Sequence, residues 1–229
     1  MMNPWLISSL ALFAVWLLIF LLNKNLRRKM IFGSLITMPL GLTEPLFVPE
    51  YWNPPSLFNL AATTGFDIES FIFTFSIGGI AVVLYEIFFK AKHKKISKYE
   101  MHGKRHRFHL LALLSPVIVF LALYLLTNLN PIYSGIIAMF TGGFAAVLCR
   151  PDLKTKVLAG GFLFLLLYFA GFLIFNFLYG KGVEQIWNLS AISGILILGI
   201  PIEELLFALS FGMMWSSIYE HIKWYKIIK

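Results

Sequence analysis

The sequence predicts an all-α integral membrane protein with seven transmembrane helices, built as two parallel three-helix repeats joined by a linking helix. Three observations support this: an apolar composition, basic residues confined to alternate loops, and an internal duplication. Of 229 residues, 59% are hydrophobic and 13% are charged, and the mean hydropathy is +0.80. Soluble domains are about 45–50% apolar and about 25% charged, so the composition excludes an ordinary soluble fold.

Seven apolar segments approach the length of about 20 residues that a membrane-spanning helix requires. They are Trp5–Leu22, Met30–Leu46, Phe66–Phe89, Phe108–Leu126, Ile132–Cys149, Val157–Tyr179 and Pro201–Lys223. The second is the least regular, because Pro39, Glu44 and Pro45 interrupt it. The first lacks a basic head and a small-residue cleavage site, so we expect a permanent helix rather than a cleaved signal peptide.

The charge distribution predicts the orientation. The formal net charge is +8, and 18 of the 19 Lys and Arg residues fall in alternate loops, with Lys181 as the exception. The positive-inside rule then places the N-terminus outside and the C-terminus in the cytoplasm. This asymmetry accounts for the positive charge without nucleic acid as a partner, and it favours contact with membrane lipid.

A long motif occurs twice. Residues Ile68–Ile87 (IESFIFTFSIGGIAVVLYEI) align with Ile202–His221 (IEELLFALSFGMMWSSIYEH) at a shift of 134 residues. The dipeptides Trp52-Asn53 and Trp187-Asn188 repeat at a shift of 135. Both copies of the helix run in the same direction, so we expect parallel repeats related by a twofold axis along the membrane normal.

The duplication predicts one membrane domain over residues 1–229. The repeats cover roughly 1–92 and 130–229, and the linker with the fourth apolar segment covers roughly 93–129. A proline-rich stretch, Glu44–Gly65, precedes the first repeated helix, and Lys181–Ile200 precedes the second. Both are too apolar for free loops, so we expect them at the interface or folded back into the protein. Their aromatic residues Tyr51, Trp52 and Trp187 also suit an interfacial belt.

The repeated carboxylates are the main candidates for chemistry. Glu69 and Glu203 each begin a strongly apolar run, and ionisable groups in membrane segments are costly enough to suggest function. The alternative is helix capping, because Pro201 suits a first helical turn and the macrodipole favours Glu203 and Glu204 there. Glu86 and Glu220, at the basic end of the same helices, are expected to form ion pairs.

Spacing places further groups beside these carboxylates. Residues four and three apart share a helix face, which groups Glu203 with Phe207 and Ser210, and likewise Glu69 with Phe73 and Ser76. Gly78 and Gly212 fall on the opposite side, where they suit close helix packing. A buried, protonated carboxyl can donate a proton, an ionised neighbour can accept one, and aromatic faces attract a developing cation.

No motif for a cofactor is visible, so the expected chemistry is proton transfer without one. The basic segment Lys90–His109 holds four of the five histidines, which makes a metal site conceivable. The surrounding cations favour instead a solvated loop attracted to anionic lipid, and we expect no metal. The single Cys149 is expected to be a packing residue.

The motif PIEELLF (Pro201–Phe207), the duplicated helix and the upstream Trp-Asn dipeptides resemble the FAD-independent membrane lycopene cyclases of the heterodimeric or fused type. This resemblance covers most of the chain and implies an isomerase, or intramolecular lyase, of carotenoid biosynthesis. An acid protonates the terminal double bond of lycopene, a six-membered ring closes, and a base removes a proton to leave a β-ring. The resemblance implies no cofactor and a hydrophobic polyene as substrate.

Carried over by position, Glu203 and Glu204 match the family motif, and Glu69 matches its first acid in the other repeat. There the sequence reads FDIES, with Asp67 in place of the motif's proline and Ser70 in place of the second acid. Asp67 could supply the missing charge. The candidate catalytic residues are therefore Glu203, Glu204, Glu69 and Asp67. The candidate substrate-binding residues are Phe73, Phe207, Ser76, Ser210, Trp52, Asn53, Trp187, Asn188 and Glu44.

Two other functions stay open at this level. The altered FDIES segment suits a non-catalytic isoprenoid-binding membrane protein, and parallel repeats also occur in small transporters. The sequence leaves open the number of rings formed, which glutamate is the acid, and the oligomeric state.

Overall fold

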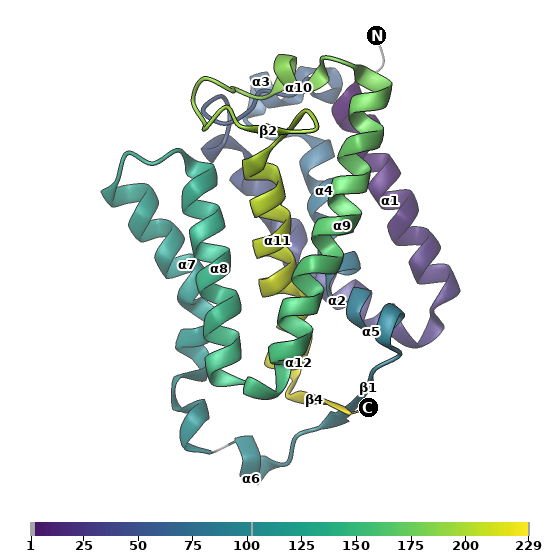
Figure 1. Cartoon of the computed structure of the whole chain (residues 1–229), viewed down its shortest axis with the longest axis vertical. Helices are drawn as coiled ribbons and strands as arrows, with labels where there is room; N and C mark the ends of the chain where they lie inside the picture. Colours follow the sequence, from purple (N-terminus) through teal and green to yellow (C-terminus); the bar gives the residue numbers. More distant parts are fainter. Residues whose placement is uncertain (1–2, 102, 229) are drawn as a thin grey trace. The chain divides into compact units, whose positions relative to one another are not determined.

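The computed structural model describes residues 3–101 and 103–228 and is predominantly helical (Figure 1). Within these ranges, five helical stretches are long and apolar enough to cross a membrane. They contain α1 (Pro4–Leu22), α4 (Ile68–Ala81) followed by α5 (Leu84–Phe89), α7 (His109–Leu126), α8 (Pro131–Cys149) and α9 (Lys154–Tyr179). Five of the seven predicted spans are thereby present as long apolar helices.

The other two predicted spans are not among these five stretches. The second is α2 (Arg27–Thr37) continued by the 3₁₀ helix η2 (Met38–Leu46), which contains two prolines that lack the N–H an α-helix needs. The seventh divides into α11 (Ile202–Ser216) and α12 (Ile218–Lys223). The seven-helix repeat arrangement therefore stays a prediction.

Short elements connect these helices. They are η1 (Lys24–Leu26), η3 (Leu57–Asn59), α3 (Leu60–Thr64), β1 (Lys92–Lys95), α6 (Lys98–Met101), η4 (Lys104–Phe108), η5 (Pro151–Leu153), α10 (Gly182–Ile186), β2 (Leu196–Ile197), β3 (Ile200–Pro201) and β4 (Tyr225–Ile228).

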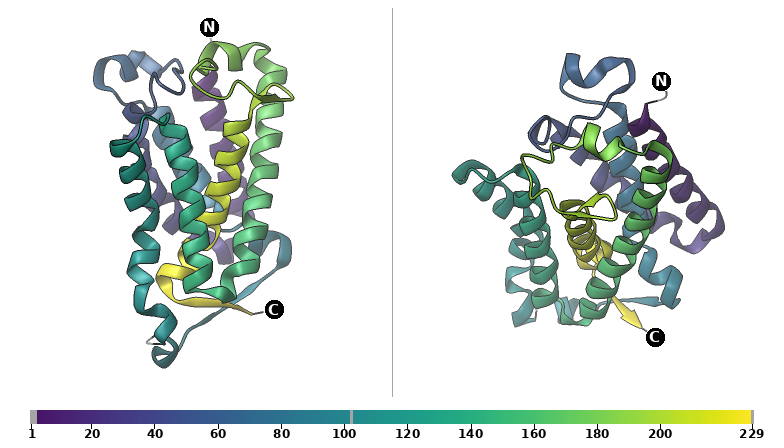
Figure 2. Two further views of the ribbon diagram at one scale, coloured as in Figure 1. Left: turned by 60° about the vertical axis from the view of Figure 1, so that its left-hand side comes forward. Right: turned by 45° about the horizontal axis from the view of Figure 1, so that its top comes forward.

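The start of α11 differs by one residue from the prediction. Pro201 was expected in the first helical turn, but it belongs to β3, and α11 begins at Ile202. The reason is the antiparallel hairpin of β2 and β3, in which Pro201 pairs with Leu196. Figure 2 shows this hairpin folded over the start of α11.

The chain divides into two compact units. Unit 1 comprises Met1–Ile80, Asn130–Ile132 and Tyr168–Leu205, and unit 2 comprises Ala81–Leu129, Tyr133–Leu167 and Leu206–Lys229. Each unit contains residues from both predicted repeats.

In unit 1 the two Trp-Asn dipeptides pair with each other. Trp52 and Trp187 form an antiparallel β-bridge. The Asn53 amide donates to the Ile186 carbonyl (2.7 Å), and the Asn188 amide donates to the Tyr51 carbonyl (2.9 Å). The segments that precede α4 and α11 are therefore joined through equivalent residues.

The expected close packing at the repeated glycines is confirmed within each unit. In unit 1, a Cβ atom at Gly78 would collide with the side chain of Thr37 and the carbonyl of Gly33. In unit 2, a Cβ atom at Gly212 would collide with the Phe164 side chain and the Gly160 carbonyl. Small residues of this kind let helix backbones approach closely in membranes.

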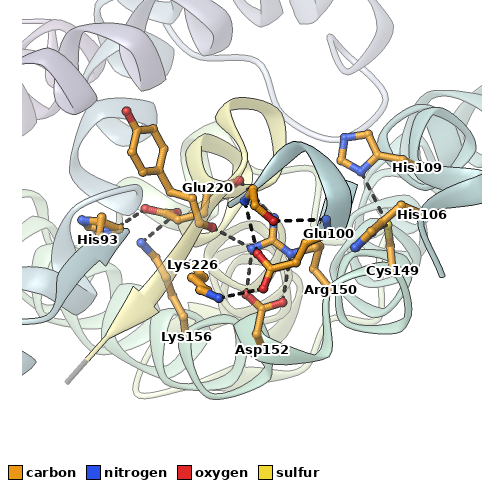
Figure 3. A network of polar contacts seen from close by, with 12 residues as sticks. His93, Glu100, His106, His109, Cys149, Arg150, Asp152, Lys156, Glu220 and Lys226 are labelled. Atoms are coloured by element: carbon orange, nitrogen blue, oxygen red, sulfur yellow. Dashed lines mark hydrogen bonds and ion pairs between the residues drawn. The ribbon is translucent and has the colours of Figure 1, made fainter. Parts of the chain in front are cut away.

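Unit 2 contains a buried ion-pair cluster. The ammonium of Lys156 pairs with Glu86 and, at 3.0 Å, with Glu220, and all three side chains are buried (Figure 3). His93 also contacts both carboxylates, at 3.0 and 2.8 Å. The expected ion pairing of Glu86 and Glu220 is thus confirmed. Strand β1, which carries His93, pairs antiparallel with β4.

Replacement of Gly78 by alanine is expected to destabilise the protein by about 1–3 kcal/mol, because the added methyl group has no space. The matched control is Gly171→Ala in α9, where a Cβ atom meets nothing within 4 Å. Alanine there is expected to be neutral or stabilising, since glycine costs about 0.5–1 kcal/mol within a helix. Thermal denaturation in detergent micelles measures both variants, and equal stability of Gly78→Ala and wild type would contradict the packing.

Candidate active site

Glu204 is the most fully hydrogen-bonded carboxylate of unit 1. It lies in the first turn of α11 and is buried. Its Oε1 accepts the Tyr51 hydroxyl (2.5 Å) and the Trp187 indole N–H (2.8 Å), and its Oε2 accepts the Tyr168 hydroxyl (2.8 Å). Three neutral donors from three segments thus replace the water that an ionised carboxylate loses on burial.

The donors themselves keep their protons. Burial, followed by the nearby Glu204 carboxylate, raises the pKa of the Tyr51 phenol well above its usual value. Tyr51 therefore stays a hydrogen-bond donor at neutral pH. Trp187 is also buried, and its N–H points at a carboxylate. The structure thus favours a role inside unit 1 over the interfacial-belt interpretation for these two residues.

The equivalent carboxylates Glu69 and Glu203 are held in similar ways. Both are fully buried at helix starts. The backbone N–H of Leu57 donates to Glu69 (2.7 Å), and that of Ser193 donates to Glu203 (2.9 Å). Each donor belongs to the segment that precedes the glutamate's own helix, so the two copies share a local arrangement.

Glu69 has one further partner and one oxygen without a partner. The Asn3 side-chain amide donates to the Glu69 Oε1 at 2.7 Å. The side-chain Oδ1 of Asn3 also caps α1, because it accepts the backbone N–H groups of Trp5 and Leu6. Among the described residues, the buried Glu69 Oε2 has no hydrogen-bond partner. An unpaired buried oxygen is costly in an ionised carboxylate.

Aromatic rings form a closed circuit of contacts in unit 1. In order around the circuit, the rings are Trp5, Trp52, Trp187, Phe172, Tyr168 and Phe73. Successive ring centroids lie 4.6–6.4 Å apart. Two of these residues, Trp187 and Tyr168, also donate to Glu204. Aromatic faces attract a cation. Unit 1 therefore places several groups that favour positive charge, the rings and a carboxylate, next to one another.

Asp67 does not reproduce the position of Glu204 in the first repeat. Its Oδ1 accepts the Ser70 backbone N–H at 2.5 Å and so caps α4. Asp67 also lies close enough to Glu44 to interact with it electrostatically. Both carboxylates are buried, and the structure's described residues offer no hydrogen-bond partner to Asp67 Oδ2 or Glu44 Oε1.

The other predicted residues have backbone or packing contacts. The Ser76 and Ser210 hydroxyls donate to the carbonyls of Ile72 (2.6 Å) and Phe207 (3.1 Å) in their own helices. Phe207 belongs to unit 2 and stacks on Phe211 with centroids 5.7 Å apart. Unit 1 therefore brings together most of the predicted site residues, but Phe207 and Ser210 are not among them.

Several residues of this site carry no sequence motif. Tyr168 lies within an uninterrupted apolar helix, and Asn3 and Trp5 precede or begin the first one. The one available signal is a tyrosine or asparagine inside an otherwise apolar segment, where a buried polar group needs a partner.

Comparison with known proteins gives one match. The family model described as lycopene cyclase matches residues 3–88 and 130–222, which together make up more than half of the chain. No curated protein and no solved structure matches the chain. Each matched stretch lies within one of the two predicted repeats. The chain belongs to the lycopene cyclase family.

Proposed function

We propose that this protein cyclises the linear end groups of lycopene to β-rings by acid–base chemistry without a cofactor. Family membership supports a membrane enzyme of carotenoid biosynthesis that acts on a hydrophobic carotenoid. The observation that carries the finer proposal is that unit 1 buries Glu69, Glu203 and Glu204 and contains a closed circuit of aromatic rings. Membrane insertion with the C-terminus in the cytoplasm, as the basic loops predict, belongs to the same proposal.

The proposed reaction conserves atoms and electrons. A carboxyl O–H transfers its proton to the terminal double bond of the end group. The neighbouring double bond supplies the electron pair that closes a six-membered ring and moves the positive charge into it. A carboxylate then removes a proton next to the charged carbon, which restores a double bond. Substrate and product are isomers.

We assign the proton donor to Glu69. Its Oε1 already accepts two hydrogen bonds, and its buried Oε2 is a suitable position for the acidic proton. Glu69 lies one helical turn before Phe73, a member of the aromatic circuit. The donor would therefore act next to the rings that stabilise the carbocation.

Glu204 and Glu203 are assigned complementary roles. We assign to Glu204 the fixed negative charge that favours the carbocation, because three hydrogen bonds stabilise its ionised form. Glu203, its neighbour at the start of α11, is the proposed base that removes the final proton.

Replacing Glu69, Glu203 or Glu204 singly by glutamine is expected to reduce turnover by about 10²–10⁴-fold, because each variant loses a proton-transfer group or the fixed charge. The readout is conversion of lycopene to β-carotene in lycopene-accumulating bacteria, quantified by liquid chromatography. Glu184→Gln is the control, because Glu184 is an exposed carboxylate on α10.

Two results would count against this proposal. Full activity of all three variants would remove the glutamates from the mechanism. Well-folded wild-type protein that binds lycopene without converting it would favour a non-catalytic isoprenoid-binding protein, the alternative that Ser70 in the FDIES segment suits.

Removing a single donor to Glu204 tests its role as a fixed charge. Tyr51→Phe and Tyr168→Phe keep the rings and delete one hydrogen bond each, and a hydrogen bond to a charged group is worth about 1.5–3 kcal/mol. We expect about 10–100-fold slower cyclisation per amount of membrane-inserted protein. Tyr179→Phe, in the same helix as Tyr168, is the control because its ring packs on Phe175. Unchanged initial rates in both test variants would show that the Glu204 hydrogen bonds do not contribute.

A further inference from the structure

Unit 2 brings together three metal-binding side chains from distant parts of the sequence. His106 lies in η4, His109 begins α7, and Cys149 ends α8 (Figure 3). The Cys149 Sγ lies 3.6 Å from the His106 Nδ1 and 3.5 Å from the His109 Nδ1. One ligand atom from each residue lies within 4.8 Å of the others. This arrangement differs from the solvated loop and simple packing cysteine expected from the sequence.

These distances match those between ligands of a tetrahedral zinc ion. Bond lengths of about 2.0–2.1 Å for Zn–N and about 2.3 Å for Zn–S place nitrogen and sulfur about 3.5–3.6 Å apart at a tetrahedral angle. A thiol carries one proton, so it can donate to one of the two imidazoles only. We propose that His106, His109 and Cys149 form a structural Zn²⁺ site.

The surroundings supply a candidate fourth ligand and an orienting contact. The His221 ring packs edge-on against His109 with centroids 4.4 Å apart. His221 is 2% exposed, and its Nε2 has no hydrogen-bond partner within the described part of the chain. The Trp224 ring stacks on His109 at 4.1 Å and fixes its orientation. A water molecule would complete four-coordination; His221 is not among the residues whose ligand atoms lie within 4.8 Å of one another, so it would have to move toward the metal to do so.

The Arg150 guanidinium, next to Cys149 in the sequence, does not exclude a metal ion, because the Asp152 carboxylate balances its charge. The Arg150 guanidinium makes two hydrogen bonds to Asp152, at 2.9 and 2.7 Å. A cavity of about 400 Å³, lined by His106, Arg150 and Asp152 among others, gives an entry path from solvent. Zinc binding would release the thiol proton of Cys149, and the resulting thiolate would supply the negative charge that zinc requires.

The second possible cluster of this unit is a weaker candidate. Glu86, His93 and Glu220 also lie within ligand distance of one another. However, the Lys156 ammonium already pairs with both carboxylates there. A divalent cation would have to displace or approach that buried charge.

A metal ion at this position would hold α7 in place. Among its described residues, α7 has no buried side chain. Zinc would tie the start of α7 to the end of α8, two helices that the short segment 127–130 joins at their other ends. The inferred role is structural, and it is independent of the proposed cyclisation.

Zinc binding by the purified full-length protein tests this inference. The protein is prepared in detergent with an affinity tag that lacks histidine, and treated with chelator. Zn²⁺ titration against a chromophoric chelator is expected to give one site per chain. Because Cys149 is the single cysteine, Zn²⁺ should slow its alkylation by a maleimide at least tenfold, and chelator should reverse this. This alkylation assay needs no variant, so it holds even if a substitution prevents folding.

Variants locate the site. Cys149→Ser and His109→Gln are expected to weaken Zn²⁺ binding at least 100-fold, whereas His93→Gln, in the other cluster, should leave it unchanged. Co²⁺ in place of Zn²⁺ should show thiolate-to-metal charge-transfer absorption that Cys149→Ser abolishes. Folded wild-type protein that binds no stoichiometric Zn²⁺, or whose Cys149 alkylates equally fast with and without it, would overturn the proposal.

Discussion

The burial of Glu204 is the constraint on which the organisation of unit 1 depends. A buried ionised carboxylate costs several kcal/mol unless other groups replace its hydration. Tyr51, Tyr168 and Trp187 provide that replacement from three separate segments of the chain. The irregular segments before α4 and α11 must therefore be in place for the carboxylate to be stable. Their mutual pairing through the Trp52–Trp187 bridge fixes both at once. Stability and the proposed catalytic electrostatics thus rest on the same hydrogen bonds.

The two copies of the repeated motif are equivalent in position and unequal in chemistry. Glu69 and Glu203 each accept a backbone N–H from the preceding segment. One residue later the copies diverge, since Ser70 occupies the place of Glu204. Only the second copy therefore carries a carboxylate surrounded by three donors. In the proposed mechanism this inequality separates the roles, with an acid in one copy and a fixed charge with a base in the other.

The sequence was sufficient to predict the helical membrane class, the repeated carboxylates and the glycine packing, because apolar runs and periodicity indicate these directly. The ion pairs of Glu86 and Glu220 could be predicted from the basic residues at that end of the helices. The irregularity of the second span was expected from its prolines, but the sequence was not sufficient for the division between α11 and α12 or for the β2–β3 hairpin before α11. Partners such as Tyr168 also could not be foreseen, because contacts between distant segments leave no spacing pattern. The approach of His106 and His109 to Cys149 was missed for the same reason.

In the proposed reaction, a carboxyl proton in exchange with water ends on the carotenoid. The most direct measurement is the mass of the product formed by wild-type protein in lycopene-loaded liposomes in D₂O, with preformed β-carotene as the control for passive exchange. Acid–base cyclisation predicts about one deuterium per ring, because protonation creates one new C–H bond at each end group. Cyclised product without deuterium would contradict a solvent-exchanged glutamate as the acid.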